Sequence, residues 1–412
     1  MFDKTGLLSQ YKGLRREIYV LFFGRVVTNL GAMVWPMLTL IMSQKLGMSA
    51  STIAVVMVFA GVVMLPANLI GGKLADKYNK KKIIVTFDIV SIVCFIICGL
   101  VPLSFKTIII FFVAGIGQNL EGPSYNALLA DLSTTADREK AYSLMYLGGN
   151  LGLVLSPTIA GLLFKNYLWL SFIISGVAIG ISTILIALKI KDITPEKDTS
   201  EESVYQKERS DVSIITVLKE NKVVILFTVC MALYYSAYHQ YGYLMPLDMG
   251  RVHGENGAAL FGTVSSLNCI VVVIFTPLIT RIFRKLINTK KIFLGQALVL
   301  VGYVVFLLFL GHIPFYYLAM LLFTWGEIFT TISEGPYTST RIPASHRGRI
   351  NGFSTLLGSV FQGVSELSVG VLYDNYGSTA AWTLVTGMVI AAMVLTLILI
   401  RLDRKAYPKL YS

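Results

Sequence analysis

Four glutamates and one arginine stand inside long apolar stretches of this sequence, where an ionised side chain is costly and usually has a function. Glu121 and Glu334 each begin the tripeptide Glu-Gly-Pro. Glu327 lies about two helical turns before the second of these, and Glu366 and Arg25 lie in two other stretches. We expect this set to line a cavity and to include a proton-coupling group, for which Glu327 has the most central position. The alternative is that the acids pair with arginines or backbone donors and only hold helices together.

The elements that must position these residues are membrane-spanning helices. The chain has 412 residues, of which 55% are hydrophobic and 14% charged, and a water-soluble core cannot bury that much apolar surface. Apolar runs of about 20 residues recur along it, whereas a barrel would show alternating strands of about ten. We therefore predict an all-α integral membrane protein whose twelve transmembrane helices span residues 17–44, 50–75, 82–103, 107–131, 139–164, 167–190, 222–247, 257–283, 291–311, 313–341, 349–373 and 379–401. Because proline has no N–H to donate, we also expect both Glu-Gly-Pro sites to break their helices.

The basic residues set the orientation. Of the 35 Lys and Arg residues, only Lys45, Lys106, Lys165 and Arg251 fall in the loops that follow odd-numbered helices. The positive-inside rule then places both termini in the cytoplasm of a cell that carries the protein in its plasma or inner membrane. The net charge of +12 is thus a topology signal and gives no reason to expect nucleic-acid binding. The four cysteines lie inside helices without metal-ligand spacing, so we expect no metal site.

The chain also contains an internal repeat. A charged, polar segment at 191–221 predicts a cytoplasmic linker between an N-terminal bundle, 1–190, and a C-terminal bundle, 222–412. Glu-Gly-Pro falls in the fourth helix of each half, and Arg138 in "DREKAYSL" matches Arg349 in "RGRINGFS" before the fifth. These matches predict two pseudo-symmetric bundles of six helices, with a substrate site between them near the midplane.

One loop carries a specific resemblance. The segment "GKLADKYNKK", which runs from Gly72 to Lys81, resembles the signature loop of the major facilitator superfamily, with Asn79 in place of a glycine and Lys80 in place of an arginine. The resemblance covers essentially the whole chain and implies the major facilitator fold. It also implies a cytoplasmic gate in which Asp76 meets the start of the eleventh helix and Lys80 pairs with Asp131 at the end of the fourth. The alternative is an ordinary basic loop. The gate residues so assigned are Gly72, Asp76, Lys80, Asp131, Arg138 and Arg349.

Two further motifs resemble those of proton-coupled multidrug exporters in the same superfamily. The fifth helix carries "GGNLGLVLSPTIAG", in which Ser156 replaces the usual glycine, and the small residues allow close helix contact. The tenth helix carries "WGEIFTTISEGP". The usual arginine of the fourth helix is missing, so the resemblance leaves Arg25 to supply that charge and to compensate Glu121.

Aromatic and amide side chains complete the predicted cavity. In "YYSAYHQYGY", Tyr234, Tyr238 and Tyr241 share one helix face and His239 lies on the next. Such a face could hold a lipophilic cation by cation–π attraction, and packing against neighbouring helices is the alternative. Further candidates for the cavity wall are Asn29, Trp35, Gln118 and Trp325.

No enzyme or nucleotide-binding motif accompanies these residues, and we expect no cofactor. An ion gradient or the substrate's own gradient must then supply the energy. Our first hypothesis is proton-coupled export of lipophilic or cationic small molecules by alternating access, by a monomer in the lipid bilayer. The second is a carrier for a polar metabolite such as a sugar, peptide or organic acid. The third is a membrane receptor or lipid-handling protein that transports nothing.

Overall fold

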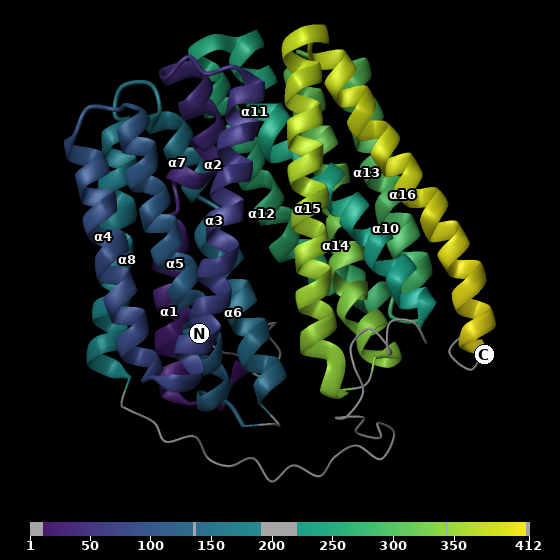
Figure 1. Cartoon of the computed structure of the whole chain (residues 1–412), viewed down its shortest axis with the longest axis horizontal. Coiled ribbons are helices and arrows are strands. Elements are labelled where there is room, and N and C mark those ends of the chain that lie inside the picture. Colours follow the sequence, from purple (N-terminus) through teal and green to yellow (C-terminus); the bar gives the residue numbers. More distant parts are fainter. Residues whose placement is uncertain (1–10, 135–136, 191–220, 343, 409–412) are drawn as a thin grey trace. The chain divides into compact units, whose positions relative to one another are not determined.

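The computed structural model of the chain describes residues 11–134, 137–190, 221–342 and 344–408, which contain helices and turns but no strands (Figure 1). Each of the twelve predicted segments contains helix. In the first half the helices are α1 (Arg16–Leu30), α2 (Val34–Leu40), α3 (Ala50–Lys77), α4 (Lys80–Leu100), α5 (Phe105–Leu132), α6 (Arg138–Leu153), α7 (Ser156–Leu163) and α8 (Leu168–Lys189). In the second half they are α10 (Lys222–Tyr238), α11 (Gln240–His253), α12 (Gly257–Ile282), α13 (Asn288–Leu308), α14 (Ile313–Arg341), α15 (Ala344–Tyr376) and α16 (Ser378–Ala406).

The helices are long and apolar enough to cross a membrane. Ten stretches in the described residues meet that condition, and one of them, Lys222–Ile282, spans 61 residues and includes α10, α11 and α12. The 28-residue helix α5 is not in this set because Gln118, Asn119 and Glu121 lower its hydropathy. The predicted all-α membrane fold is confirmed.

Contacts between Cα atoms divide the chain into two compact units. Unit 1 contains residues 1–47, 59–201 and 255–270, and unit 2 contains residues 48–58, 202–254 and 271–412. The predicted linker, 191–221, lies outside the described residues except for Asn221. The division at 190 and 222 therefore stays a prediction.

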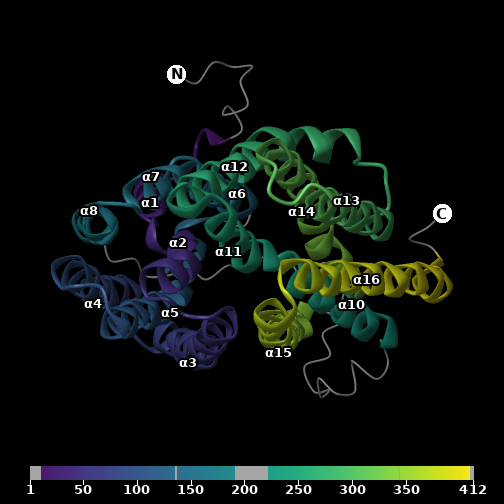
Figure 2. The same ribbon diagram turned by 90° about the horizontal axis from the view of Figure 1, so that it is seen from above.

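The two halves use the same helix pairings. In unit 1, α4 packs against α5 and α8, and α1 packs against α6 and α8 (Figure 2). In unit 2, α13 packs against α14 and α16, and α10 packs against α15 and α16. Counted as predicted transmembrane segments, these are the same four pairs in each half, as a duplicated six-helix unit requires.

The helix breaks are not where the sequence analysis expected them. Helices α5 and α14 run without interruption through Pro123 and Pro336, so the predicted breaks at Glu-Gly-Pro are wrong. The fixed φ of proline is compatible with a helix, and the loss of one backbone hydrogen bond does not end a helix held by its neighbours. The breaks lie instead after Leu30, between α6 and α7 just before Pro157, and at His239 between α10 and α11.

Small residues let helices approach closely, as predicted for the fifth transmembrane segment. A Cβ atom built on Gly152 would lie 2.4 Å from the carbonyl oxygen of Val26 on α1. A Cβ on Gly161 would lie 2.4 Å from the carbonyl oxygen of Ala258, in the part of α12 that belongs to unit 1. Any larger side chain at these positions would force the backbones apart, so this prediction is confirmed.

Candidate functional site

Unit 1 contains a pocket of about 440 Å³ between its helices. Residues of α1, α2, α4, α5, α6 and α8 line it, and several of them were predicted to face a cavity. The polar and aromatic lining includes Arg25, Thr28, Asn29, Trp35, Asp88, Gln118, Glu121, Tyr125, Asn126, Ser175 and Ser182.

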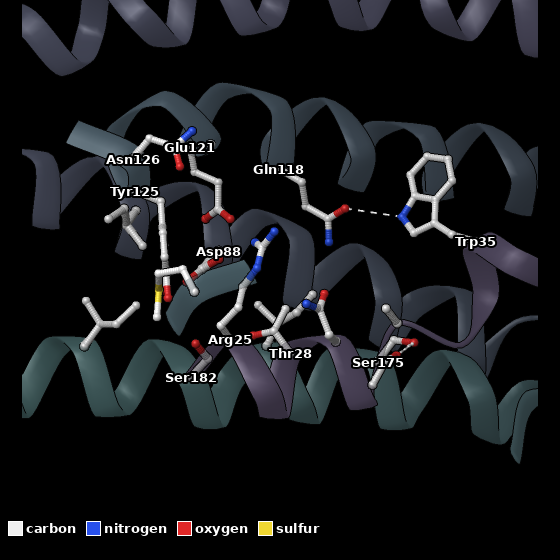
Figure 3. A pocket seen from close by; sticks show the side chains of 18 of the residues that line it. Arg25, Thr28, Trp35, Asp88, Gln118, Glu121, Tyr125, Asn126, Ser175 and Ser182 are labelled. Carbon is white, nitrogen blue, oxygen red and sulfur yellow. Dashed lines mark hydrogen bonds between the residues drawn. The ribbon is translucent and has the colours of Figure 1, made fainter. Parts of the chain in front are cut away.

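Three ionisable side chains from three helices meet in this pocket. Arg25 comes from α1, Asp88 from α4 and Glu121 from α5, and their charged groups point toward one another (Figure 3). The carboxyl groups of Asp88 and Glu121 lie close enough to influence each other, and the guanidinium of Arg25 attracts the carboxyl group of Glu121. The Oε2 atom of Glu121 is buried and has no hydrogen-bond partner among the described residues. A buried polar atom without a partner is rare and calls for an explanation, such as a proton or a ligand that this atom can bind.

Asp88 is the member of the cluster that sequence reasoning missed. It is 5% exposed, and its Oδ2 accepts a hydrogen bond of 2.6 Å from the Oγ1 of Thr183 on α8. The signal was present in the sequence, because Asp88 is an acid inside the predicted third helix, 82–103. The rule that drew attention to the four glutamates applies to it equally.

The rest of the pocket wall holds this cluster in place. The hydroxyl of Tyr125 donates to the backbone oxygen of Leu21 at 2.8 Å, and the ring centroid lies 6.0 Å from the guanidinium carbon of Arg25. Farther along, Nε1 of Trp35 donates to Oε1 of Gln118 at 3.4 Å (Figure 3). The pocket therefore has a charged part and an aromatic and amide part.

The charge balance of the cluster decides what the pocket can bind. Two ionised carboxylates against one guanidinium leave one negative charge in a site sheltered from water. Such a charge is costly unless a proton or a cation neutralises it. A proton and a cationic ligand would therefore compete for the same place.

The other predicted acids lie in unit 2 and bind neutral partners. Glu327 accepts a hydrogen bond of 2.7 Å from the hydroxyl of Tyr238, and Glu334 accepts one of 2.9 Å from that of Tyr235. Each carboxyl thus binds a different tyrosine. That the two glutamates share a proton stays a prediction. Glu366 on α15 accepts a hydrogen bond of 2.9 Å from Gln362, one turn earlier on the same helix.

The aromatic residues predicted on the seventh transmembrane segment contact one another through their rings. The ring centroids of Tyr234 and Tyr238 lie 6.1 Å apart, those of Tyr238 and Tyr241 5.2 Å, and those of Tyr235 and His239 6.0 Å. Tyr234 is fully buried, so its ring packs inside the helices of unit 2. Trp325, the last of the predicted cavity residues, packs edge-on against Phe275 with the centroids 5.6 Å apart.

The ion pair that the signature loop implied is present. The Nζ of Lys80 lies 2.7 Å from Oδ2 of Asp131, and Asn79 caps α4 by accepting from the backbone N–H of Lys82. A Cβ on Gly72 would meet nothing within 4 Å. The remaining gate contact would join Asp76 in unit 1 to α15 in unit 2, and it stays a prediction. The side chains of Arg138 and Arg349 lie outside the described residues.

Comparisons with known proteins agree with this architecture. Residues 21–366 match the family model described as Major Facilitator Superfamily. A "Na(+), Li(+), K(+)/H(+) antiporter" of Planococcus maritimus is 22% identical over 87% of this chain and 90% of its own length. The multidrug resistance protein MdtH of Yersinia pestis is 24% identical over 39% of each chain.

Among solved structures, a peptide transporter POT bound to sulfate superimposes with a TM-score of 0.79 at 16% identity, over 98% of this chain and 96% of that one. At this identity the likeness shows the fold alone. The family match, by contrast, covers most of the chain and spans both halves. The chain therefore belongs to the major facilitator superfamily and is a membrane transporter, not an enzyme.

Proposed function

We propose that this chain is a proton-coupled antiporter that exports cationic or lipophilic small molecules. The observation that carries the proposal is the cluster of Arg25, Asp88 and Glu121 in the unit 1 pocket, where two carboxyls share one guanidinium. Uptake of a proton by the cluster would expel a bound cation, and loss of the proton would readmit one. Exchange of this kind, linked to alternating access, converts a proton gradient into a substrate gradient.

The size of the pocket favours an organic substrate. A volume of about 440 Å³ falls within the range of small-molecule sites, roughly 300–1,000 Å³. Trp35 offers an aromatic face at one end, and the uncompensated carboxyl offers a negative charge at the other. An aromatic monovalent cation would satisfy both groups.

A second candidate is exchange of alkali cations for protons. It is favoured by the name of the Planococcus maritimus relative, which is similar to this chain over most of its length. The same carboxyls would then bind a metal ion. A carrier for a polar metabolite remains the other alternative, for which Asn29 and Gln118 would supply hydrogen bonds.

The proposed coupling group differs from the one that the sequence analysis favoured. Tyr238 already gives Glu327 a direct hydrogen bond, whereas Glu121 keeps a buried oxygen without a partner among the described residues. We therefore assign coupling to Asp88 and Glu121.

The test uses the purified protein in lipid vesicles and ethidium as the probe cation. An imposed pH gradient should drive ethidium against its concentration gradient, and Glu121→Gln should abolish this accumulation. Glu366→Gln, whose carboxyl lies outside the pocket, is the matched control and should retain it. Sodium, lithium and potassium are tested in parallel. Accumulation of one of these instead of ethidium would support the second candidate, and no response to pH by any of the cations would refute antiport.

A further inference from the structure

The hydroxyl group of Thr183 lies between two oxygens, each of which could accept its proton. The Oγ1 of Thr183 lies 2.6 Å from Oδ2 of Asp88 and 2.8 Å from the backbone oxygen of Ile179, one turn earlier on α8. Both distances are those of hydrogen bonds. A hydroxyl group has a single proton, so it can donate to only one of these oxygens at a time.

The two contacts can be two separate hydrogen bonds only when a second proton is present; otherwise the single hydroxyl proton serves one oxygen or is shared between the two. When Asp88 is ionised, Thr183 donates to its carboxylate, and the Ile179 oxygen keeps the backbone bond of the helix. When Asp88 is protonated, its O–H donates to Oγ1 of Thr183, and the threonine proton turns to the Ile179 oxygen. One proton is gained, one hydroxyl rotates, and no heavy atom moves.

We infer that Asp88 is the carboxyl that holds the exchanged proton and that Thr183 is the positioning residue that satisfies Asp88 in both charge states. This inference rests on the proposed function and refines it, because it names one carboxyl of the pair. Glu121 then provides the charge that a cationic substrate meets, with Arg25 beside it.

The second half of the chain supplies an internal comparison. There α13 and α16 pair as α4 and α8 do, and Thr396 on α16 donates to Oε1 of Gln296 on α13 at 2.8 Å. Thr396 also has a backbone oxygen nearby, that of Ala392 at 3.0 Å. An amide oxygen is not protonated in water at ordinary pH, so Gln296 gains no proton here. The other side chain beside Thr396 is the thiol of Cys230, whose Sγ lies 2.9 Å from Oγ1 of Thr396. The same scaffold is thus proton-binding in one half and neutral in the other.

The charged and titratable groups that face Asp88 come from two of the helices around it, α5 and α1. Glu121 and Tyr125 lie on α5 and Arg25 lies on α1, while α8 contributes the neutral hydroxyl of Thr183. The hydrogen bond from Thr183 stabilises the ionised form of Asp88 more than the protonated form, since hydrogen bonds to charged groups are the stronger ones. Removing the hydroxyl should therefore disfavour the ionised form.

The experiment compares Thr183→Val, Thr183→Ser and Thr396→Val with the wild type in the full-length protein. Infrared difference titration follows the band of protonated carboxyl groups, and the pH dependence of ethidium exchange in vesicles is measured separately. We expect Thr183→Val to move both midpoints upward by about one pH unit, a tenfold change in proton affinity. Thr183→Ser should restore the wild-type midpoint, and Thr396→Val should leave it unchanged.

Three outcomes would overturn the inference. They are a Thr183→Val midpoint equal to the wild type, a serine variant that does not recover, and an equal shift in Thr396→Val. If Thr183→Val does not fold, Asp88→Asn decides the matter, because survival of the titrating infrared band in that variant assigns the proton elsewhere. The infrared result does not depend on transport. A titrating Asp88 without proton-driven exchange would therefore refute the proposed function and leave the assignment of the proton intact.

Discussion

The charge balance of the pocket predicts how many protons are exchanged. Two carboxyls, Asp88 and Glu121, face one guanidinium, so one negative charge is left for a proton or a monovalent cation to neutralise. One proton entering for each monovalent cation leaving moves no net charge across the membrane. A gradient of one pH unit, about 1.36 kcal/mol, then supports at most a tenfold cation gradient. A membrane potential of 100 mV is worth about 2.3 kcal/mol per charge, but it should not change this maximum cation gradient, because the exchange moves no net charge.

Substitution of Arg25 tests this reasoning. Arg25→Gln leaves both carboxyls uncompensated, so exchange of two protons for one cation becomes possible and is electrogenic. For such a variant the maximum cation gradient rises to about a hundredfold per pH unit. In right-side-out vesicles, a potential of 100 mV, inside negative, multiplies that gradient by about another fifty. Arg25→Lys keeps the charge and should behave as the wild type.

The assay measures the steady-state ethidium gradient across the vesicle membrane, with the pH gradient and the membrane potential set independently. Protein-free vesicles correct for passive distribution of the dye. A wild-type gradient that follows the potential would refute the one-proton count. So would an Arg25→Gln variant that still transports and ignores the potential. A variant that does not transport leaves the wild-type measurement to decide.

Three further predictions follow from the described contacts. Glu327→Gln should retain proton-driven ethidium exchange, and its loss in that variant would return the coupling role to Glu327. Gly152→Val should lower the melting temperature because the new side chain would clash with α1, whereas Gly122→Val should change stability far less, since a Cβ there meets nothing within 4 Å. Asp403→Asn should destabilise the protein by about 3–5 kcal/mol, because it removes the carboxylate charge that binds the guanidinium of Arg341, whose side chain is 4% exposed. A change under 1 kcal/mol in chemical denaturation would contradict this.

Hydropathy was sufficient to predict the helices, because every span must bury about 20 residues in hydrocarbon. The internal repeat was predicted from the two Glu-Gly-Pro motifs, since a duplication keeps its motifs in the same order along each half of the chain. The breaks were not predictable by the same means. Pro123 lies within a continuous helix and Pro157 just after a break, and only the packing around each decides which occurs.

The candidate site was predicted in part. Arg25 and Glu121 were expected to lie together, and they do, because an ionised side chain inside the membrane is costly unless an opposite charge lies nearby. Asp88 was overlooked, although its position in a predicted span marked it equally well. Its partner Thr183 could not have been singled out, because a lone threonine in an apolar helix usually bonds its own backbone, as Thr183 also does.

The glutamine at position 296 also has a genetic consequence. Either codon for glutamine becomes a codon for glutamate by one nucleotide substitution. That change would place a second carboxyl within reach of the hydroxyl of Thr396, on a scaffold that already holds such a pair in the other half. Under the inferred role of Asp88, Gln296→Glu would thus give the second half the same pair of a threonine and a carboxyl group.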